Sequence, residues 1–399
     1  MSNVLMILDA EFPPDPRVEN EAETLMSQGH TVHLMCFGYN VSTDEFFDYN
    51  GIKVHRKKCP KYVYKLSALA YTVPFYHWIT ARWIKQILKE VEVDVIHVHD
   101  IQIYRAAKWA NVDGIPLVLD LHENRPEIMK SYSHVQSLMG RLLISPNRWK
   151  KHEYRAIREV YYLIVVTEEA KTYYVDELDV SADKIISLPN SVRYEFYSKE
   201  DLQIDILNKF RDNYVILYVG DTGIRRGLLT AIEAVYELKE KITNIKLVIV
   251  GSNKSDGILK ERVDELLLED YISFEGWQNF ETFPAYIASS HICISPLYRN
   301  IHHDTTYANK IFQYMSMGKP VIVSDCPAQA HVIEKAKSGI VFEAENTVQL
   351  AEAILELNQN PDRAKEMGEN GKVFVSEDFS WEKTSKSFVN LYKILNNEL

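Results

Sequence analysis

Thr305–Asp325, TTYANKIFQYMSMGKPVIVSD, predicts a short helix, a turn at Gly318 and then a buried strand, VIVSD. In a helix, Thr306, Lys310 and Gln313 at i, i+4 and i+7 would share one face. A lysine near a helix start adds a full charge to the partial positive charge of free N–H groups, which suits a phosphate. The amide of Gln313 suits a sugar hydroxyl. The stretch therefore predicts an anion site, although an ordinary amphipathic helix with a solvated lysine also fits.

A glycine-rich turn follows an earlier predicted strand. The run YVILYV leads into GDTGIRRGL, Gly220–Leu228, and then into a helical pattern. Gly220 and Gly223 let the backbone approach a ligand closely, and Arg225 and Arg226 add two permanent cations. The spacing is neither a Walker A loop nor G-x-G-x-x-G, and such turns are common without a ligand. Two cationic helix starts in one half of the chain nevertheless predict a diphosphate site.

Strand-like runs alternate with helical patterns along the 399 residues, which predicts an α/β protein with two Rossmann-like, doubly wound parallel sheets. The pattern restarts after a linker near Ser187–Tyr194, so we expect domains at 1–187 and 188–376. Ligands of such sheets bind beyond the carboxyl ends of the strands. The expected strands are Val4–Asp9, Thr31–Cys36, Val93–His97, Leu117–Asp120 and Leu163–Val166, then Val215–Val219, Lys246–Val250, Tyr271–Phe274, Ile292–Ser295 and Pro320–Ser324.

Composition narrows the class of protein. The four cysteines include no C-x-x-C pair, so neither a disulfide framework nor a zinc site is expected. The chain opens directly into the strand VLMILDA, so we expect no signal peptide and a cytoplasmic location. The net charge of −11 argues against nucleic acid as a partner. No Asp-x-Asp is present to hold a metal, so we expect no metal and no cofactor, and side-chain cations must stabilise any leaving phosphate.

The charge is unevenly distributed. Lys53 to Arg158 contains 19 Lys and Arg against 9 Asp and Glu, a balance of +10, which leaves 26 against 47, or −21, for the rest. This region holds two aromatic stretches, Leu66–Ala81 and the basic NRWKKHEYRAIREVYY from Asn147 to Tyr162. They predict that the first domain binds peripherally to an anionic membrane surface, the inner face of the plasma membrane. Charge scatter, or helices that simply pack on the sheet, explains them equally, and both interpretations can hold together.

The order of these segments resembles that of the family 4 glycosyltransferases of the GT-B fold. The resemblance covers nearly the whole chain and includes FPPDPRVENEAETLMSQGHTVHLM, VDVIHVHD, LVLDLHE, LIVVTEEA, LPNSV, the Gly220 loop, LVIVGS, ISFEGW and the Thr305 stretch. Each segment is short, but their order and spacing together are hard to reproduce by chance. The resemblance implies two domains that face each other across a cleft, and a last helix within residues 377–399 that crosses back to the first domain.

The resemblance also implies roles for single residues. His122 matches the histidine that lies against the donor sugar, and Arg226 matches the second of two cations near the diphosphate. Asp221 stands near the usual place of the first cation, so Arg225 or Lys310 would have to replace it. The family's Glu-x7-Glu is absent, because Thr305 and Gln313 occupy its two positions. Gln313 can still accept hydrogen bonds from ribose hydroxyls, but without charge, which predicts weaker nucleotide binding.

The remaining candidates divide between donor and acceptor. Asn190 and Trp277 end segments near the expected nucleotide site, although Trp277 also fits a core position and His122 also fits a surface loop. The full donor set is Gly220, Gly223, Arg225, Asn190, Trp277, Thr306 and Gln313. The acceptor set is Asp15, Arg17, His99, Asp100 and Glu123.

We therefore expect a retaining, metal-independent glycosyltransferase of the hexosyl type, with His122, Arg226 and Lys310 as catalytic residues. It would move a sugar from a nucleotide-diphospho-sugar to a hydroxyl of a cell-surface glycan or lipid-linked acceptor, as in polysaccharide biosynthesis. Retention is implied by the resemblance alone. A nucleotide-sugar epimerase of the same fold, a non-catalytic GT-B binding module and a transferase with a soluble acceptor remain alternatives.

Overall fold

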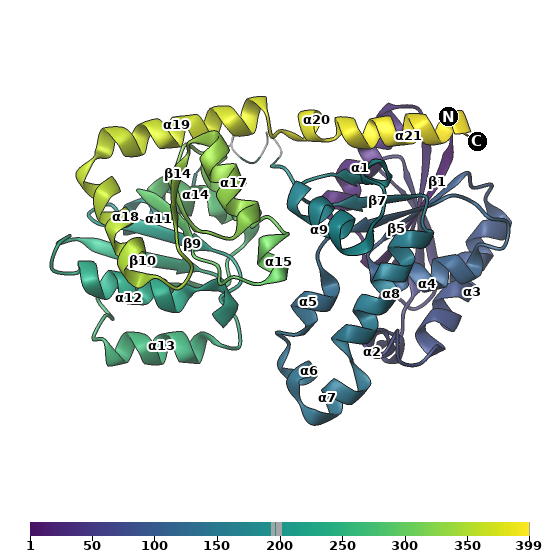
Figure 1. Cartoon of the computed structure of the whole chain (residues 1–399), viewed down its shortest axis with the longest axis horizontal. Helices are drawn as coiled ribbons and strands as arrows, with labels where there is room; N and C mark the ends of the chain where they lie inside the picture. The colour runs from purple at the N-terminus through teal and green to yellow at the C-terminus, as the bar shows by residue number, and fades with distance from the viewer. Residues whose placement is uncertain (193–195, 197–201, 399) are drawn as a thin grey trace. The chain divides into compact units, whose positions relative to one another are not determined.

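The computed structural model describes residues 1–192, 196 and 202–398. The chain forms two compact units (Figure 1). Met1–Pro189 and the segment from Ser385 onward make the first unit, and Asn190–Thr384 make the second. Each unit is an α/β domain built on its own, mostly parallel sheet. This confirms the predicted fold class.

The first unit has an eight-stranded sheet in the order β3-β4-β2-β1-β5-β6-β7-β8. All pairs are parallel except β3 with β4; in the centre, Val4 lies opposite Val32 on one side and Val95 on the other. The strands are β1 Asn3–Glu11, β2 Thr31–Gly38, β3 Glu45–Tyr49, β4 Ile52–Lys58, β5 Val95–His99, β6 Leu117–Leu121, β7 Tyr162–Val165 and β8 Ile185–Ser187.

Helices connect these strands, as parallel pairing requires. They are α1 Pro16–Ser27, α2 Lys61–Ser67, α3 Phe75–Glu90, α4 Ile101–Ala110, α5 Arg125–Met129, α6 Ser133–Gln136, α7 Leu138–Leu143, α8 Pro146–Glu159 and α9 Glu168–Leu178. The C-terminal helix α21, Lys386–Glu398, packs on the same unit, where the Tyr392 hydroxyl lies 2.7 Å from Nδ1 of His97. Within the described residues, no helix is long and apolar enough to cross a membrane.

The second unit has a six-stranded parallel sheet in the order β11-β10-β9-β12-β13-β14. Its strands are β9 Tyr214–Val219, β10 Ile245–Val250, β11 Ile272–Gly276, β12 Ile292–Ser295, β13 Val321–Ser324 and β14 Gly339–Phe342. Its helices are α11 Ile204–Lys209, α12 Leu228–Leu238, α13 Asp256–Glu265, α14 Phe283–Ser289, α15 Ile301–Asp304, α16 Lys310–Ser316, α17 Pro327–Ala336, α18 Thr347–Gln359, α19 Pro361–Glu377 and α20 Trp381–Thr384.

The central strand β9 shows why helices cover both faces of this sheet. Val215, Leu217 and Val219 join one apolar cluster, which includes residues of α14 and α16. Ile216 and Tyr218 point the other way and join a second cluster with α12 and α18. Because successive side chains of a strand alternate, an all-apolar strand must be covered twice. Both faces therefore exclude water, and the strand ends are left to carry polar groups.

The antiparallel edge strand β3 and its partner β4 were not among the expected strands. Asn50 and Gly51 join them with φ of 51° and 89°, so both turn residues are left-handed. An Asn-Gly pair between two extended runs favours this kind of turn, so the signal was present in the sequence. The short strands β8 and β14 were missed as well.

Candidate active site

The ammonium of Lys310 lies at the centre of the basic site in the second unit. Lys310 is the first residue of α16, and its Nζ is 3.4 Å from the centroid of the Tyr218 ring. Nζ is buried and has no hydrogen-bond partner among the described residues. Burial, with the nearby Arg226 guanidinium, holds the pKa of Lys310 well below its ordinary value, against the opposing effect of Asp221. An anion placed here would supply the missing partner.

The glycine-rich turn lies against this lysine. Gly220 follows β9 with φ of 128°, and a Cβ built there would lie 3.4 Å from Nζ of Lys310. Gly227 has φ of 75°, and a Cβ there would come within 1.6 Å of the Pro296 carbonyl oxygen. The turn therefore packs directly on the segment that follows β12. This contact brings together the two cationic stretches that lie some 80 residues apart in the sequence.

Arg225 and Arg226 are held by different partners. Nε of Arg226 donates to Oδ2 of Asp221 at 3.2 Å. NH1 of Arg225 lies 3.2 Å from Nε2 of His303, whose Nδ1 is 2.7 Å from the Tyr298 carbonyl oxygen. Burial, with Arg225, Arg226 and Lys310 close by, lowers the pKa of His303 to about 3. His303 therefore stays neutral and can accept from Arg225, so the described part of the site contains two arginine cations, the Lys310 amino group and one carboxylate, Asp221.

The prediction that Thr306 lies in one helix with Lys310 and Gln313 is wrong. Helix α15 ends at Asp304, with Thr305 as its C-cap, and α16 begins only at Lys310, so Thr306 lies between two helices. The β-branched threonines and Asn309 favour an interruption over one continuous helix. Lys310 and Gln313 do share α16, one turn apart. Thr306 contributes a buried hydroxyl that has no partner among the described residues.

In the first unit, His122 stands at the carboxyl end of β6. Its Nε2 is 3.1 Å from Oδ2 of Asp120, and its backbone N–H donates to Oδ1 of Asp100 at 3.1 Å. Burial opposes the charged form, but Asp100 and Asp120 together raise the pKa of His122 to about 9. His122 is therefore an imidazolium at neutral pH, and its side chain is 21% exposed.

Asp100 has an unusual backbone for a residue with a side chain. It follows β5 with φ of 67° and ψ of 154°, a region that non-glycine residues rarely occupy. Strain of this kind persists where the surroundings fix the residue, which is common at functional sites. The carboxylate of this strained residue lies beside His122: Oδ2 of Asp100 is 3.8 Å from Nδ1 of His122.

Behind His122, a buried ion cluster stabilises Asp120. The Arg17 guanidinium makes two hydrogen bonds to Asp120, of 2.9 Å and 2.7 Å, and Nε lies 3.0 Å from Oε1 of Glu21. Arg17 and His122 hold the pKa of Asp120 well below its usual range despite burial, whereas burial beside Asp120 raises that of Glu21. Arg17, a predicted acceptor-side residue, is only 7% exposed. Its observed contacts place it in the support behind His122.

Glu21, His97, His99 and Asp120 also form the kind of group that could hold a metal ion. One ligand atom from each lies within 4.8 Å of the others, and all four side chains are buried. Arg17 forms ion pairs with both carboxylates of this group, so one positive charge already offsets part of their charge. Burial lowers the pKa of His99 to about 3, which keeps it neutral between Asp120 and His122. The predicted absence of a metal stays a prediction.

The other predicted residues are more dispersed. Asp15 caps α1 by accepting from the backbone N–H groups of Arg17 and Val18, and Glu123 pairs with Arg125 at 2.9 Å. Trp277 follows β11 and is 77% exposed, which excludes the core position. Gly223 begins the turn Ile224–Arg226, and Asn190 is the first residue of the second unit.

Sequence reasoning missed several polar groups at these strand ends. Asp9, near the end of β1, accepts from Gln102 and Tyr76, and burial beside Asp100 raises its pKa to about 6. In the second unit, Asn253 donates to Asp221. The available signal was position alone, since Asp9 is the last residue of a predicted strand and Asn253 lies three residues beyond another. Tyr218 gave no signal, because it reads as an ordinary buried strand residue.

Comparisons with known proteins agree with this arrangement. Residues 17–196 match the family described as Glycosyltransferase Family 4, and residues 199–374 match Glycosyl transferases group 1. The alpha-D-kanosaminyltransferase of Streptomyces kanamyceticus is 22% identical over 70% of this chain and 71% of its own. A GDP-mannose-dependent phosphatidylinositol monomannoside mannosyltransferase of Mycobacterium tuberculosis is 24% identical over 40% and 42%.

Solved structures share the fold. Sucrose-phosphate synthase from Thermosynechococcus elongatus superposes with a TM-score of 0.79 at 17% identity and covers all of both chains. Anabaena HepE, solved in complex with UDP, gives 0.71 at 14% identity over 98% of this chain and 99% of its own. The two families together span residues 17 to 374 apart from two positions. The chain is a glycosyltransferase and belongs to family 4 of the GT-B enzymes.

Proposed function

We propose that this enzyme is a retaining, metal-independent hexosyltransferase that uses a nucleotide-diphospho-sugar. The observation that carries the proposal is the amino group of Lys310, which is buried beside Gly220 and Arg226 and has no hydrogen-bond partner in the part of the chain that the structure describes. A buried cation that lacks an anion is costly, so the site favours a ligand that supplies one. The nucleotide diphosphate of the donor is such a ligand, and UDP in the complex of HepE is of this class.

The same cations act on the departing group. When the bond between C1 of the sugar and the phosphate oxygen breaks, negative charge grows on that oxygen. Lys310 and Arg226, with Arg225 held by His303, stabilise this charge because they are placed before the reaction begins. Gln313 and the buried hydroxyl of Thr306 supply neutral groups for the hydroxyls of the donor. Both groups can form hydrogen bonds with a polar ligand without adding charge to the site.

His122 serves the sugar side of the reaction. As an imidazolium fixed by Asp120 and Asp100, it donates a hydrogen bond in a fixed direction. We propose that it orients a hydroxyl of the donor sugar and that Asp100 and Glu123 meet the acceptor. We propose retention by analogy with the family, with the acceptor hydroxyl attacking on the face that the diphosphate leaves.

The acceptor that we propose is a hydroxyl of a lipid-linked or cell-surface glycan, reached from the cytoplasmic face of a membrane. Helix α8 presents the exposed cations Lys151, Arg155 and Arg158 at i, i+4 and i+7. Helix α3 exposes Phe75 and Trp78. Such a combination suits an anionic interface. The mannosyltransferase relative acts on a phosphatidylinositol mannoside, as its name states, which supports a lipid acceptor.

Transfer assays test the leaving-group model. Lys310→Ala and Arg226→Ala should each lower kcat by about a hundredfold, the usual effect of losing one preplaced charge partner. The matched control is Lys372→Ala, which removes an exposed lysine from α19 in the same unit. Unchanged turnover in both site variants would contradict the proposal.

Sedimentation of the protein with lipid vesicles at low salt tests the membrane model. We expect more protein to sediment with anionic vesicles than with neutral ones, and equal recovery with both would refute the model.

A further inference from the structure

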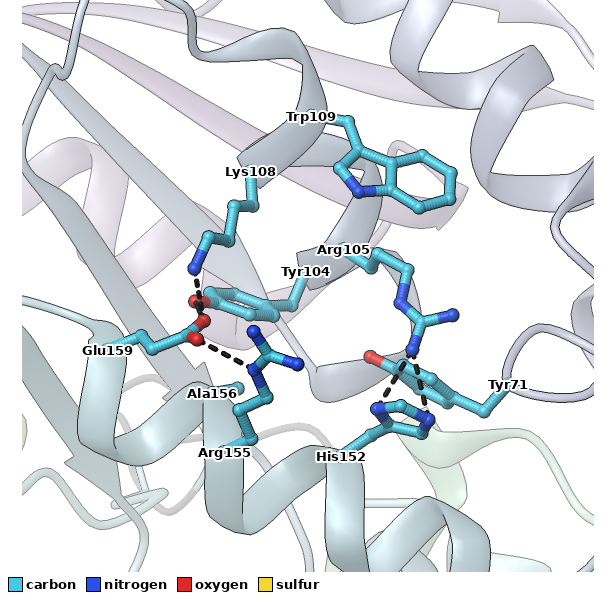
Figure 2. A pocket seen from close by; sticks show the side chains of 9 residues that line it. All are labelled: Tyr71, Tyr104, Arg105, Lys108, Trp109, His152, Arg155, Ala156 and Glu159. Atoms are coloured by element: carbon cyan, nitrogen blue, oxygen red, sulfur yellow. Dashed lines mark hydrogen bonds and ion pairs between the residues drawn. The ribbon is translucent and has the colours of Figure 1, made fainter.

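A pocket of about 230 Å³ lies in the first unit, between the outer faces of α4 and α8 (Figure 2). We call it the α4–α8 pocket. It is lined by Tyr71, Tyr104, Arg105, Lys108, Trp109, His152, Arg155, Ala156 and Glu159. Helix α4 leaves the carboxyl end of β5, so Lys108 and Trp109 at its far end lie away from that edge. Helix α8 leads into β7, so Glu159 lies near the opposite edge. Lys108, Trp109 and Glu159 therefore lie away from the strand ends that carry His122, and His122 is not among the residues that line the pocket.

The charges that line the pocket do not balance. Glu159 is its one carboxylate, and Lys108 and Arg155 already bind it, the latter at 2.8 Å (Figure 2). Arg105 has no carboxylate partner among the described residues; its NH2 lies 2.8 Å from Nδ1 of His152. The three cations therefore exceed the one carboxylate by two charges, and Arg105 is the cation that no carboxylate of the described residues binds. Burial, with Arg105 and Arg155 beside it, lowers the pKa of His152 to about 4, so that ring is neutral.

Aromatic rings fix the direction of this spare guanidinium. Its carbon lies 4.7 Å from the centroid of the Tyr71 ring and 5.8 Å from that of Trp109. Tyr71 is itself held, because its ring stacks on His152 at 4.6 Å and its hydroxyl donates to the Ile101 carbonyl at 2.6 Å. A guanidinium packed in this way loses little freedom when it binds an anion. Arginine then meets a phosphate with two parallel N–H donors.

We propose that the α4–α8 pocket binds a phosphate ester, with Arg105 as its anchor and the rings of Tyr71 and Trp109 against the ester's apolar part. A phospholipid headgroup and a soluble phosphate ester share this chemistry. The exposed cations of α8 and the exposed Trp78 of α3 favour the lipid headgroup as the source. The choice of a lipid headgroup therefore rests on the membrane binding proposed above. The phosphate site itself does not depend on it.

Calorimetric titration of the intact protein separates the sources. The probes are dihexanoyl phosphatidylglycerol below its micelle concentration, dihexanoyl phosphatidylcholine, glycerol 3-phosphate and inorganic phosphate. We expect saturable binding of phosphatidylglycerol, and weaker binding of phosphatidylcholine because its own cation competes. Glycerol 3-phosphate that binds as tightly as phosphatidylglycerol would support the site and identify a soluble ester as its ligand.

Three variants should change the affinity for the phosphate compound in three different ways. Arg105→Gln should weaken binding by about tenfold or more, since it removes a charge-assisted pair. Glu159→Gln should tighten binding several-fold, because it frees Lys108 and Arg155. Arg158→Gln makes the same charge change as Arg105→Gln on an exposed position of α8 outside the pocket and should leave binding of the monomeric lipid unchanged. Nucleotide binding in each variant reports whether the protein is folded, and it should not change.

The proposal is overturned if no phosphate compound binds saturably, or if Arg105→Gln binds as the unaltered protein does while Glu159→Gln binds no more tightly. Failure of the proposed function would give a different result. Either no sugar transfer would be detected or Lys310→Ala would turn over as fast as the unaltered protein, while titrations of the α4–α8 pocket would still respond to Arg105 and Glu159.

Discussion

Replacing Lys310 by methionine should uncouple nucleotide binding from proton uptake. Methionine keeps most of the side-chain volume and removes the charge. In the free protein, burial and Arg226 hold the pKa of Lys310 well below its ordinary value. A bound diphosphate favours the ammonium and raises that pKa. Between the free and bound pKa values, binding therefore takes up as much as about one proton, and affinity falls as the pH rises through the bound value.

The magnitude follows from the contact that is missing in the free protein. Nζ has no hydrogen-bond partner among the described residues, so a diphosphate oxygen would add a charge-assisted bond without breaking one. Hydrogen bonds to charged groups contribute roughly 1.5–3 kcal/mol, which corresponds to about 10- to 150-fold in affinity. Lys310→Met should lose affinity by this factor.

The assay is calorimetry at one pH in two buffers with different enthalpies of ionisation. UDP, GDP and ADP are screened first, and the nucleotide that binds is carried forward. The apparent enthalpy should depend on the buffer in the unaltered protein and in the Lys372→Met control, but not in Lys310→Met. If the unaltered protein takes up no proton and Lys310→Met binds equally well, the buried ammonium does not meet the diphosphate and the reasoning fails.

Four other outcomes follow. Gly227→Ala should destabilise the second unit by several kcal/mol, because its Cβ would lie 1.6 Å from a carbonyl oxygen, whereas Gly257→Ala meets nothing within 4 Å and should not; thermal unfolding compares them. The His122 contribution to stability is complete below pH 6.5 and is lost as the pH rises through about 9, so denaturant unfolding of His122→Gln should lack this decline. Arg17→Met should cost about 3–5 kcal/mol at pH 7, since two buried carboxylates lose their cation, and equal urea midpoints would contradict this. Transfer should continue in excess EDTA; loss of activity that Mg²⁺ or Mn²⁺ restores would refute metal independence.

The fold was readable because several central strands are almost wholly apolar. Runs such as YVILYV and the VIV of VIVSD leave no polar face, so they had to be parallel strands covered by helices on both sides. Edge strands lack this signal. Strand β3, EFFDY, is mostly exposed and was missed in spite of the Asn50–Gly51 turn that follows it.

The candidate site was readable only where its residues are close in sequence. Arg225 and Arg226 fall together in one turn, but the closeness of Arg226 to Lys310 is a tertiary contact that spacing alone does not reveal. The role of Arg17, in contrast, could not be predicted from the sequence. Its partner Asp120 is 103 residues away, so an arginine in a predicted loop gave no sign that it would be buried in an ion pair.

A structure of the protein with a bound nucleoside diphosphate tests the central claim most directly. We predict that diphosphate oxygens lie within hydrogen-bond distance of Nζ of Lys310 and of the Arg226 guanidinium, with no divalent ion between them. A diphosphate seated away from both side chains, or bound to them only through a metal ion, would contradict the account.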